Sequence, residues 1–294
     1  MTLHIQLTAI ASCFMAVAAF AQDSIPFSKR QNLGSVRHVE IHEASGLVAS
    51  RVNARHFWTH NDSGDAARIF LIDDSARHKA TFYLEGIHAC DWEDIGVMER
   101  QGVNYLVVGD IGDNAGRRAV VDVHIFEEPL LSRSGPIIDT IPNAAIRSFA
   151  LRYEDGSRDA ESLFFDPIDE RLYVVSKREL RVGLYYTELP KGLKPVDTLV
   201  LRREATLPLT FITAADISPD GTELLMKNLV SVFYWTRKRG ESVADALSKP
   251  AVVLPYLPEP QGEAIAFSYE GKGYYTLSEA VLGMDVVFYF YNRL

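Results

Sequence analysis

The chain contains a repeating pattern in which two short apolar runs are joined by a polar turn and flanked by polar or acidic residues. The clearest copy covers residues 91–114, where an acidic head precedes the first run and Asp110, Asp113 and Asn114 follow the second. Apolar runs of this length, bounded by turn residues, are typical of β-hairpins. We therefore predict a hairpin that carries carboxylates at its open end.

The hairpin pattern recurs along the chain. Further copies begin at Glu43, Asp159, Thr213 and Gln261, at intervals of about 50 to 70 residues. Their turns use Pro-Asp-Gly, Asp-Pro and Gly-x-Gly, which favour tight chain reversal. Repeats of this size and content are typical of propeller blades.

The remaining β-rich runs supply the other strands of each blade, and an unpaired run at residues 35–41 precedes the first copy. If that run completes the last blade, the ring closes and its edges are paired. We predict an all-β fold, a β-propeller of five four-stranded blades closed by an N-terminal strand. Six blades are the alternative if residues 127–143 contain another blade, but this region is rich in Pro, Ser and Gly, so we expect a loop. A β-sandwich with chance repeats is a third interpretation.

The N-terminus has the pattern of a targeting segment. Residues 5–21 are almost uncharged, and Ala19-Phe20-Ala21 forms a small-x-small cleavage signal. We predict a signal peptide at residues 1–21, a single propeller domain at 22–294, and a periplasmic or secreted protein. A lipoprotein site at Cys13 is the alternative. Cleavage would leave Cys90, which we expect to be a small buried side chain.

Composition limits the classes of partner. The 294 residues are 47% hydrophobic, enough for a sizeable core in one domain. The net charge of −9 without a basic stripe argues against nucleic acid and anionic membranes. We therefore expect a monomer that neither binds nucleic acid nor inserts stably into a membrane. We expect it to bind a small-molecule substrate or ligand, which is an anion in the first of the functions considered below.

The acidic residues should gather at one place. In a propeller the first strand of each blade lines the central channel, so both polar ends of the hairpin meet at one mouth of that channel. Carboxylates packed together stay protonated, pair with cationic side chains or bind a hard cation. We predict Ca²⁺ as cofactor, with the ligands Glu43, Asp91, Glu93, Asp110, Asp113, Asn114, Glu161 and Asp216. A salt-bridged, solvated mouth without metal is the alternative.

Other polar residues of the same hairpin ends are candidates for substrate binding and catalysis. We predict substrate binding by His60, Lys177, Arg178 and Lys227, and catalysis by Glu263 and Glu93. The sequence contains no Gly-x-Ser-x-Gly elbow, no Cys/His zinc pattern and no P-loop. Trp58 and Trp92 are expected in the core rather than on a ligand.

Three motifs within residues 91–129 carry a resemblance to known proteins. They are Asp91-x-Glu93-Asp94-Ile95, Gly109-Asp110-Ile111-Gly112-Asp113-Asn114 and Ile125-Phe126-Glu127-Glu128-Pro129, with Arg117-Arg118 between the last two. The combination resembles a largely uncharacterised family of exported bacterial propellers, which is distantly similar to β-propeller phytases and lactonase-like propellers. The resemblance implies an acidic, calcium-lined mouth that binds an anionic or ester substrate. The phytase cluster of basic phosphate ligands is not evident in this sequence, which argues against phytase activity itself.

Three functions are compatible with these features. The first is a metal-dependent hydrolase of a phosphate or carboxylic ester, in which Glu263 takes the proton. The second is a non-catalytic propeller that binds a ligand or a protein, because the fold alone does not fix function. The third is a glycosidase that uses two channel carboxylates.

Overall fold

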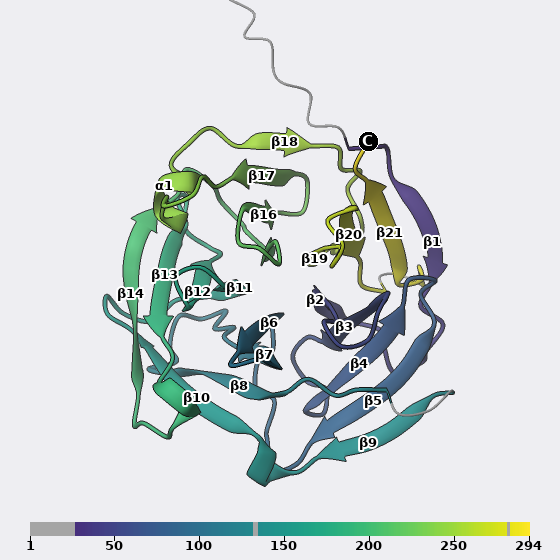
Figure 1. The fold of residues 1–294 in the computed structure, drawn as a ribbon, viewed down its shortest axis with the longest axis horizontal. Coiled ribbons are helices and arrows are strands. Elements are labelled where there is room, and N and C mark those ends of the chain that lie inside the picture. Colours follow the sequence, from purple (N-terminus) through teal and green to yellow (C-terminus); the bar gives the residue numbers. More distant parts are fainter. Residues whose placement is uncertain (1–26, 132–134, 281–282) are drawn as a thin grey trace, which may run out of the picture.

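The computed structural model describes residues 27–131, 135–280 and 283–294. The predicted signal peptide and the lipoprotein alternative at Cys13 lie outside these residues. Among them, no helix has the length and apolarity needed to cross a bilayer. The chain forms an all-β propeller, as predicted, in which short antiparallel sheets are arranged around a central axis (Figure 1).

Each of the five predicted hairpins forms the two inner strands of a sheet. The first sheet contains β2 (Ala44–Ala49), β3 (His56–Asn61), β4 (Arg68–Asp73), β5 (His78–Leu84) and β9 (Ile137–Ile141). The second set contains β6 (Asp94–Arg100), β7 (Val103–Asp110), β8 (Val121–Glu127) and β10 (Arg147–Tyr153). The third contains β11 (Ala160–Asp166), β12 (Arg171–Ser176), β13 (Gly183–Glu188) and β14 (Leu199–Thr206), and its outer strand β14 pairs in parallel with β10.

The fourth sheet contains β15 (Ala214–Ile217), β16 (Glu223–Lys227), β17 (Val232–Thr236) and β18 (Val252–Leu254). The last contains β19 (Ala264–Phe267), β20 (Gly273–Leu277), β21 (Val287–Asn292) and the N-terminal strand β1 (Gln31–Ser35). Short helical segments connect some of the strands, namely α1 (Val243–Leu247) and the 3-10 turns Asn143–Ala145 and Lys191–Leu193. Within the described residues, the inner strands β2, β6, β11, β15 and β19 contact one another in order, and β19 contacts β2 (Figure 1).

The closing strand lies earlier in the chain than predicted. β1 covers residues 31–35 rather than 35–41 and runs antiparallel to β21, with Gln31 opposite Phe290. The apolar alternation that suggested residues 35–41 continues through a turn, in which Ile41 N donates to His38 O and Val39 is exposed. Alternation therefore marked the right region of the chain but not the paired segment.

Residues 127–143 are not only a loop, which corrects the prediction. They include β9, which pairs in parallel with β5 and places Ile137 opposite Ala80. Ile137 and Ile141 are buried in the same apolar cluster as Trp58, and the residues between them are exposed. In the described part of this region the extra strand extends the first sheet instead of forming a separate blade.

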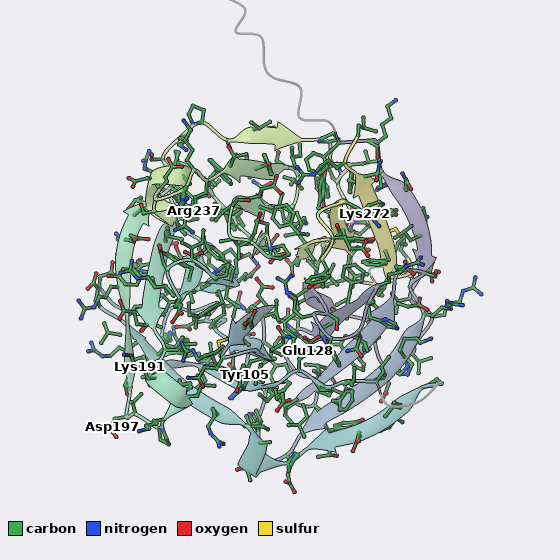
Figure 2. The ribbon with its side chains drawn as sticks, viewed as in Figure 1. Tyr105, Glu128, Lys191, Asp197, Arg237 and Lys272 are labelled. Carbon is green, nitrogen blue, oxygen red and sulfur yellow. The ribbon has the colours of Figure 1, made fainter. Side chains whose placement is uncertain are left out.

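The core consists of layers between neighbouring sheets. One apolar cluster, for example, joins Trp58 and Ile69 of the first sheet to Trp92 and Leu106 of the second set, so both tryptophans lie in the core as predicted. A buried ion pair also crosses such a boundary, because the guanidinium of Arg237 contacts both carboxylate oxygens of Asp166 at 2.7 and 2.8 Å (Figure 2). These contacts hold the inner strands in fixed positions around the channel.

Candidate functional site

Carboxylates from several blades meet at one mouth of the channel. Among the described residues, ligand atoms lie within 4.8 Å of one another in three overlapping groups, namely Asp62–Asp91–Glu93, Asp62–Glu263–Glu279 and Glu93–Asp159–Glu161. We call these seven residues the acidic mouth. The head carboxylates of three hairpins converge as predicted, at Glu93, Glu161 and Glu263, whereas Glu43 and Asp216 do not join them.

Backbone hydrogen bonds explain why both ends of each hairpin reach the acidic mouth. In three blades a residue one or two positions after the second strand donates its N–H to the head of the hairpin: Asp62 N to Glu43 O, Lys177 N to Asp159 O and Glu279 N to Gln261 O. A side chain before the first strand and a side chain after the second therefore lie side by side. The antiparallel pairing dictates this arrangement.

Burial, together with the crowding of like charges, raises the pKa values of carboxyl groups in the acidic mouth. Burial, and then the charges of Asp62 and Asp159, raise the pKa of Asp91 to about 6. Burial and the charges of Asp62 and Asp91 raise the pKa of Glu93 well above its usual range. Burial and the neighbouring Glu263 raise the pKa of Glu279 to about 8. The site therefore holds protons at neutral pH that a cation could replace.

Two of the predicted substrate-binding residues supply the local positive charge. Lys177 Nζ contacts Glu161 and lies 3.9 Å from Glu263 Oε1. The guanidinium of Arg178 contacts the carboxylate of Asp159 and the amide oxygen of Asn114. Lys177 thus lies inside the acidic mouth, whereas Arg178 is held at its edge.

Two observations bear on whether these residues suit a cation. Glu161 is 4% exposed, and its Oε2 has no hydrogen-bond partner among the described residues, although such a buried oxygen normally has one. Gly112 lies so close to the carboxylates of Glu93 and Asp91 that an added Cβ would come within 3 Å of both. Closely packed carboxylate oxygens with an unfilled acceptor are the donor set that a hard cation such as Ca²⁺ prefers.

Three predicted ligands at the end of β7 and in the loop after it contact backbone N–H groups or arginine side chains. Asp110 accepts from Cys90 N and Asp91 N and pairs with Arg118 at 2.8 Å. Asp113 accepts from the backbone N–H of Arg118. Neither aspartate belongs to the carboxylate groups above, and the amide oxygen of Asn114 accepts from Arg178. Their contacts shape the loop that carries Gly112.

Glu43 and Asp216 are also outside the acidic mouth. The Glu43 side chain is half exposed and lies 3.8 Å from His42. Asp216 accepts backbone N–H groups from Ile217 and Phe267 within the channel.

The pairing register explains the position of Asp216. Ala214 pairs with Lys227 as Ala264 pairs with Leu277, so Thr213 occupies the position of Glu263 in the fourth repeat. Asp216 lies three residues farther along, in β15. Because successive strand side chains face opposite ways, its side chain does not reach the mouth.

His60 and Lys227, both predicted to bind substrate, are fully buried. The His60 ring packs edge-on against Trp92, and burial lowers its pKa. Lys227 Nζ contacts the carbonyl oxygen of Gly262 and lies 4.9 Å from the centre of the Tyr256 ring, where burial lowers its pKa to about 8. Neither side chain presents a polar atom to solvent at the mouth.

Some residues of the mouth received no role from the sequence. Asp62, Asp159 and Glu279 flank the hairpins as expected, but spacing alone did not distinguish them from Asp110 or Asp113. The shared backbone bond to the hairpin head could have identified Asp62 and Glu279. Cys90 is exposed beside the mouth rather than buried, because the segment before β6 runs along the surface.

Comparisons with known proteins found similarity to solved structures alone. No protein-family description matches the sequence, and no curated protein matches it. A chain from the crystal structure of a nidogen/laminin complex matches 83% of this chain and 75% of its own, with 12% identity and a TM-score of 0.49. A luciferin-regenerating enzyme matches 88% of this chain and 94% of its own, with 10% identity and a TM-score of 0.46.

Proposed function

We propose that the acidic mouth binds Ca²⁺ and that the protein uses this site to hold and hydrolyse a small anionic ester, a phosphate or carboxylic ester. The observation that carries the proposal is the unpartnered Oε2 of buried Glu161 inside a group of carboxylates with raised pKa values. A cation would supply the partner that this buried oxygen lacks.

The residues of the mouth divide into ligands and reacting groups. Glu93, Glu161 and Asp159 would hold the cation, and Asp91 and Asp62, which group with Glu93, would be further ligands. A bound Ca²⁺ would supply positive charge against the substrate oxygen that becomes more negative. Lys177, between Glu161 and Glu263, would contact the anionic group of the substrate.

Glu263 is the proposed proton acceptor. Its side chain is 13% exposed, so it is accessible from the mouth, and Glu279 beside it keeps a proton up to a pH of about 8. A carboxylate next to a protonated carboxyl can accept a proton from water and pass it on. Glu93, also predicted to be catalytic, lies among the proposed ligands, so its replacement tests both roles.

Calcium binding is tested first. The melting temperature of the purified protein is measured in chelator and in millimolar Ca²⁺, since a ligand that binds only the folded state raises it. Glu161→Gln should reduce the Ca²⁺-dependent increase. Glu127→Gln, at an exposed position at the end of β8, is the matched control and should not. An increase that is equal in both variants, or absent in the wild type, would contradict the calcium site.

Hydrolysis is tested separately with a panel of phosphate esters, lactones and aryl glycosides. We expect Ca²⁺-dependent turnover of an ester or lactone, lost in Glu263→Gln while Ca²⁺ stabilisation remains. Calcium binding without turnover of any compound would leave a non-catalytic binding propeller. Turnover of glycosides alone would favour the two-carboxylate glycosidase.

Export and oligomeric state belong to the same proposal. We propose that the chain acts in the periplasm or outside the cell as a monomer, after removal of residues 1–21. Cell fractionation with N-terminal sequencing of the mature protein, and light scattering on a size-exclusion column, test these points. A mature chain that retains residues 1–21, or a stable dimer, would contradict them.

A further inference from the structure

A second cavity lies at the end of the channel opposite the acidic mouth. Its volume is about 230 Å³, and turns or strand ends from all five hairpins line it, including Arg51, Glu99, Pro167, Pro219 and Tyr269. The inner strands all begin near the mouth and run the same way, so the residues after them meet at the far end. The cavity is therefore on the propeller axis and separate from the proposed calcium site.

Arg51 supplies a guanidinium without a partner. Among the described residues, no side-chain hydrogen bond or ion pair involves this group, and its centre lies 5.1 Å from the centre of the Tyr269 ring. The backbone N–H of Arg51 donates to Glu128, whose carboxylate also accepts from Ser50 and Trp58 (Figure 2). Burial lowers the pKa of Arg51. A half-buried guanidinium that lacks a partner is a ready site for a carboxylate, which it can contact with two parallel hydrogen bonds.

Asp216 supplies a carboxyl group in the same cavity, and burial raises its pKa to about 7. Each of its carboxylate oxygens accepts one backbone N–H, at 2.7 and 2.8 Å, and retains capacity for another donor. It forms no ion pair with Arg51, although each side chain feels the charge of the other. The two charged groups thus line the cavity with a gap between them.

We propose that this cavity binds a small zwitterion of the α-amino-acid type, with its carboxylate on Arg51 and its ammonium group on Asp216. A simple anion would be repelled by Asp216, Glu99 and Glu128, and a simple cation by Arg51. A molecule that carries both charges satisfies both groups. The apolar walls, formed in part by Phe165 and Met98, and the Tyr269 ring would contact its side chain.

The test is isothermal titration of the full folded protein with a panel of L-amino acids, in chelator so that the mouth is free of added cation. We expect at least one amino acid to bind. Arg51→Met should lower the affinity for that amino acid by roughly tenfold or more, because a charged hydrogen-bond donor is lost. Arg51→Lys, which keeps the charge but not the planar fork, should bind with intermediate affinity. Arg239→Met, at an exposed turn, is the control and should bind as the wild type does.

The role of Asp216 is tested by Asp216→Asn and by ligands with one charge. Acetate and methylamine should bind at least tenfold more weakly than the preferred amino acid. Each of them can contact only one of the two charged groups, so one charge-assisted hydrogen bond is lost. The circular dichroism spectrum of Arg51→Met should match that of the wild type, which would show that any loss of binding is not caused by unfolding. This control keeps the test valid even if Asp216→Asn does not fold. No binding by any amino acid, equal binding of acetate, or unchanged affinity in Arg51→Met would overturn the proposal. None of these results depends on calcium or hydrolysis.

Discussion

Replacing Lys177 with Met tests the electrostatics of the acidic mouth. The ammonium group contacts Glu161 and lies 3.9 Å from Glu263, and the three side chains are only 12%, 5% and 13% exposed. Met retains most of the length and apolar contact of Lys but removes the charge. The variant therefore leaves two nearly buried carboxylates without their local counter-charge.

The cost can be bounded from this geometry. Two unit charges 4 Å apart interact by about 4 kcal/mol at an effective dielectric constant of 20. Removing one partner of a buried ion pair costs about 3–5 kcal/mol in proteins. The carboxylates can take up protons, so we take the lower end, about 3 kcal/mol. At about 2–4 °C per kcal/mol, the melting temperature in chelator should fall by about 6–12 °C.

The assay compares thermal melting of wild type and Lys177→Met in chelator and in Ca²⁺. Because Lys177 and the cation neutralise the same carboxylates, Ca²⁺ should stabilise the variant more than the wild type and restore most of the loss. Lys194→Met is the control, since Lys194 is exposed and has no ion pair among the described residues. It should melt as the wild type does.

Two results would refute this reasoning. If Lys177→Met melts at the wild-type temperature in chelator, the ammonium group is not the counter-charge of the mouth. If the variant is destabilised but Ca²⁺ stabilises it no more than the wild type, the cation does not bind the carboxylates that Lys177 contacts.

Three further predictions concern other parts of the fold and the mouth. Arg237→Met should destabilise the protein by about 3–5 kcal/mol in urea unfolding, because Asp166 stays buried and unpaired; a loss below about 1 kcal/mol would contradict this. Gly112→Ala should lower the free energy of unfolding by about 1–3 kcal/mol and weaken the stabilisation by Ca²⁺, because the new Cβ collides with the Glu93 side chain. Calcium binding equal to that of the wild type would contradict this prediction. Glu279 has a pKa of about 8 in the folded state and about 4.5 in the unfolded state. Between these two pH values the folded state binds the proton and the unfolded state does not, so the contribution of Glu279 to stability declines as pH rises. Glu279→Gln should flatten the decline between about pH 6.5 and 8, and an unchanged slope in calcium-free urea titrations would contradict that.

The repeated hairpins could be predicted from the sequence because their signals are local. Apolar alternation and turn residues such as Pro219 and Gly221 specify a strand pair without reference to the rest of the chain. Once the hairpins repeat around an axis, the carboxylates that precede their first strands must converge, as Glu93, Glu161 and Glu263 do. The sequence by itself therefore determined the fold class and the acidic character of one channel mouth.

The tertiary structure decided what each polar side chain contacts. Asp110 binds backbone N–H groups and Arg118, whereas Asp62 faces the other carboxylates, and both follow a second strand in the sequence. The register of its hairpin places Asp216 three residues beyond Thr213, which occupies the mouth position, and Asp216 therefore lines the same cavity as Arg51. The contacts of these side chains depend on groups that the fold brings together from distant parts of the chain. A local sequence pattern does not specify which of these groups a side chain will contact.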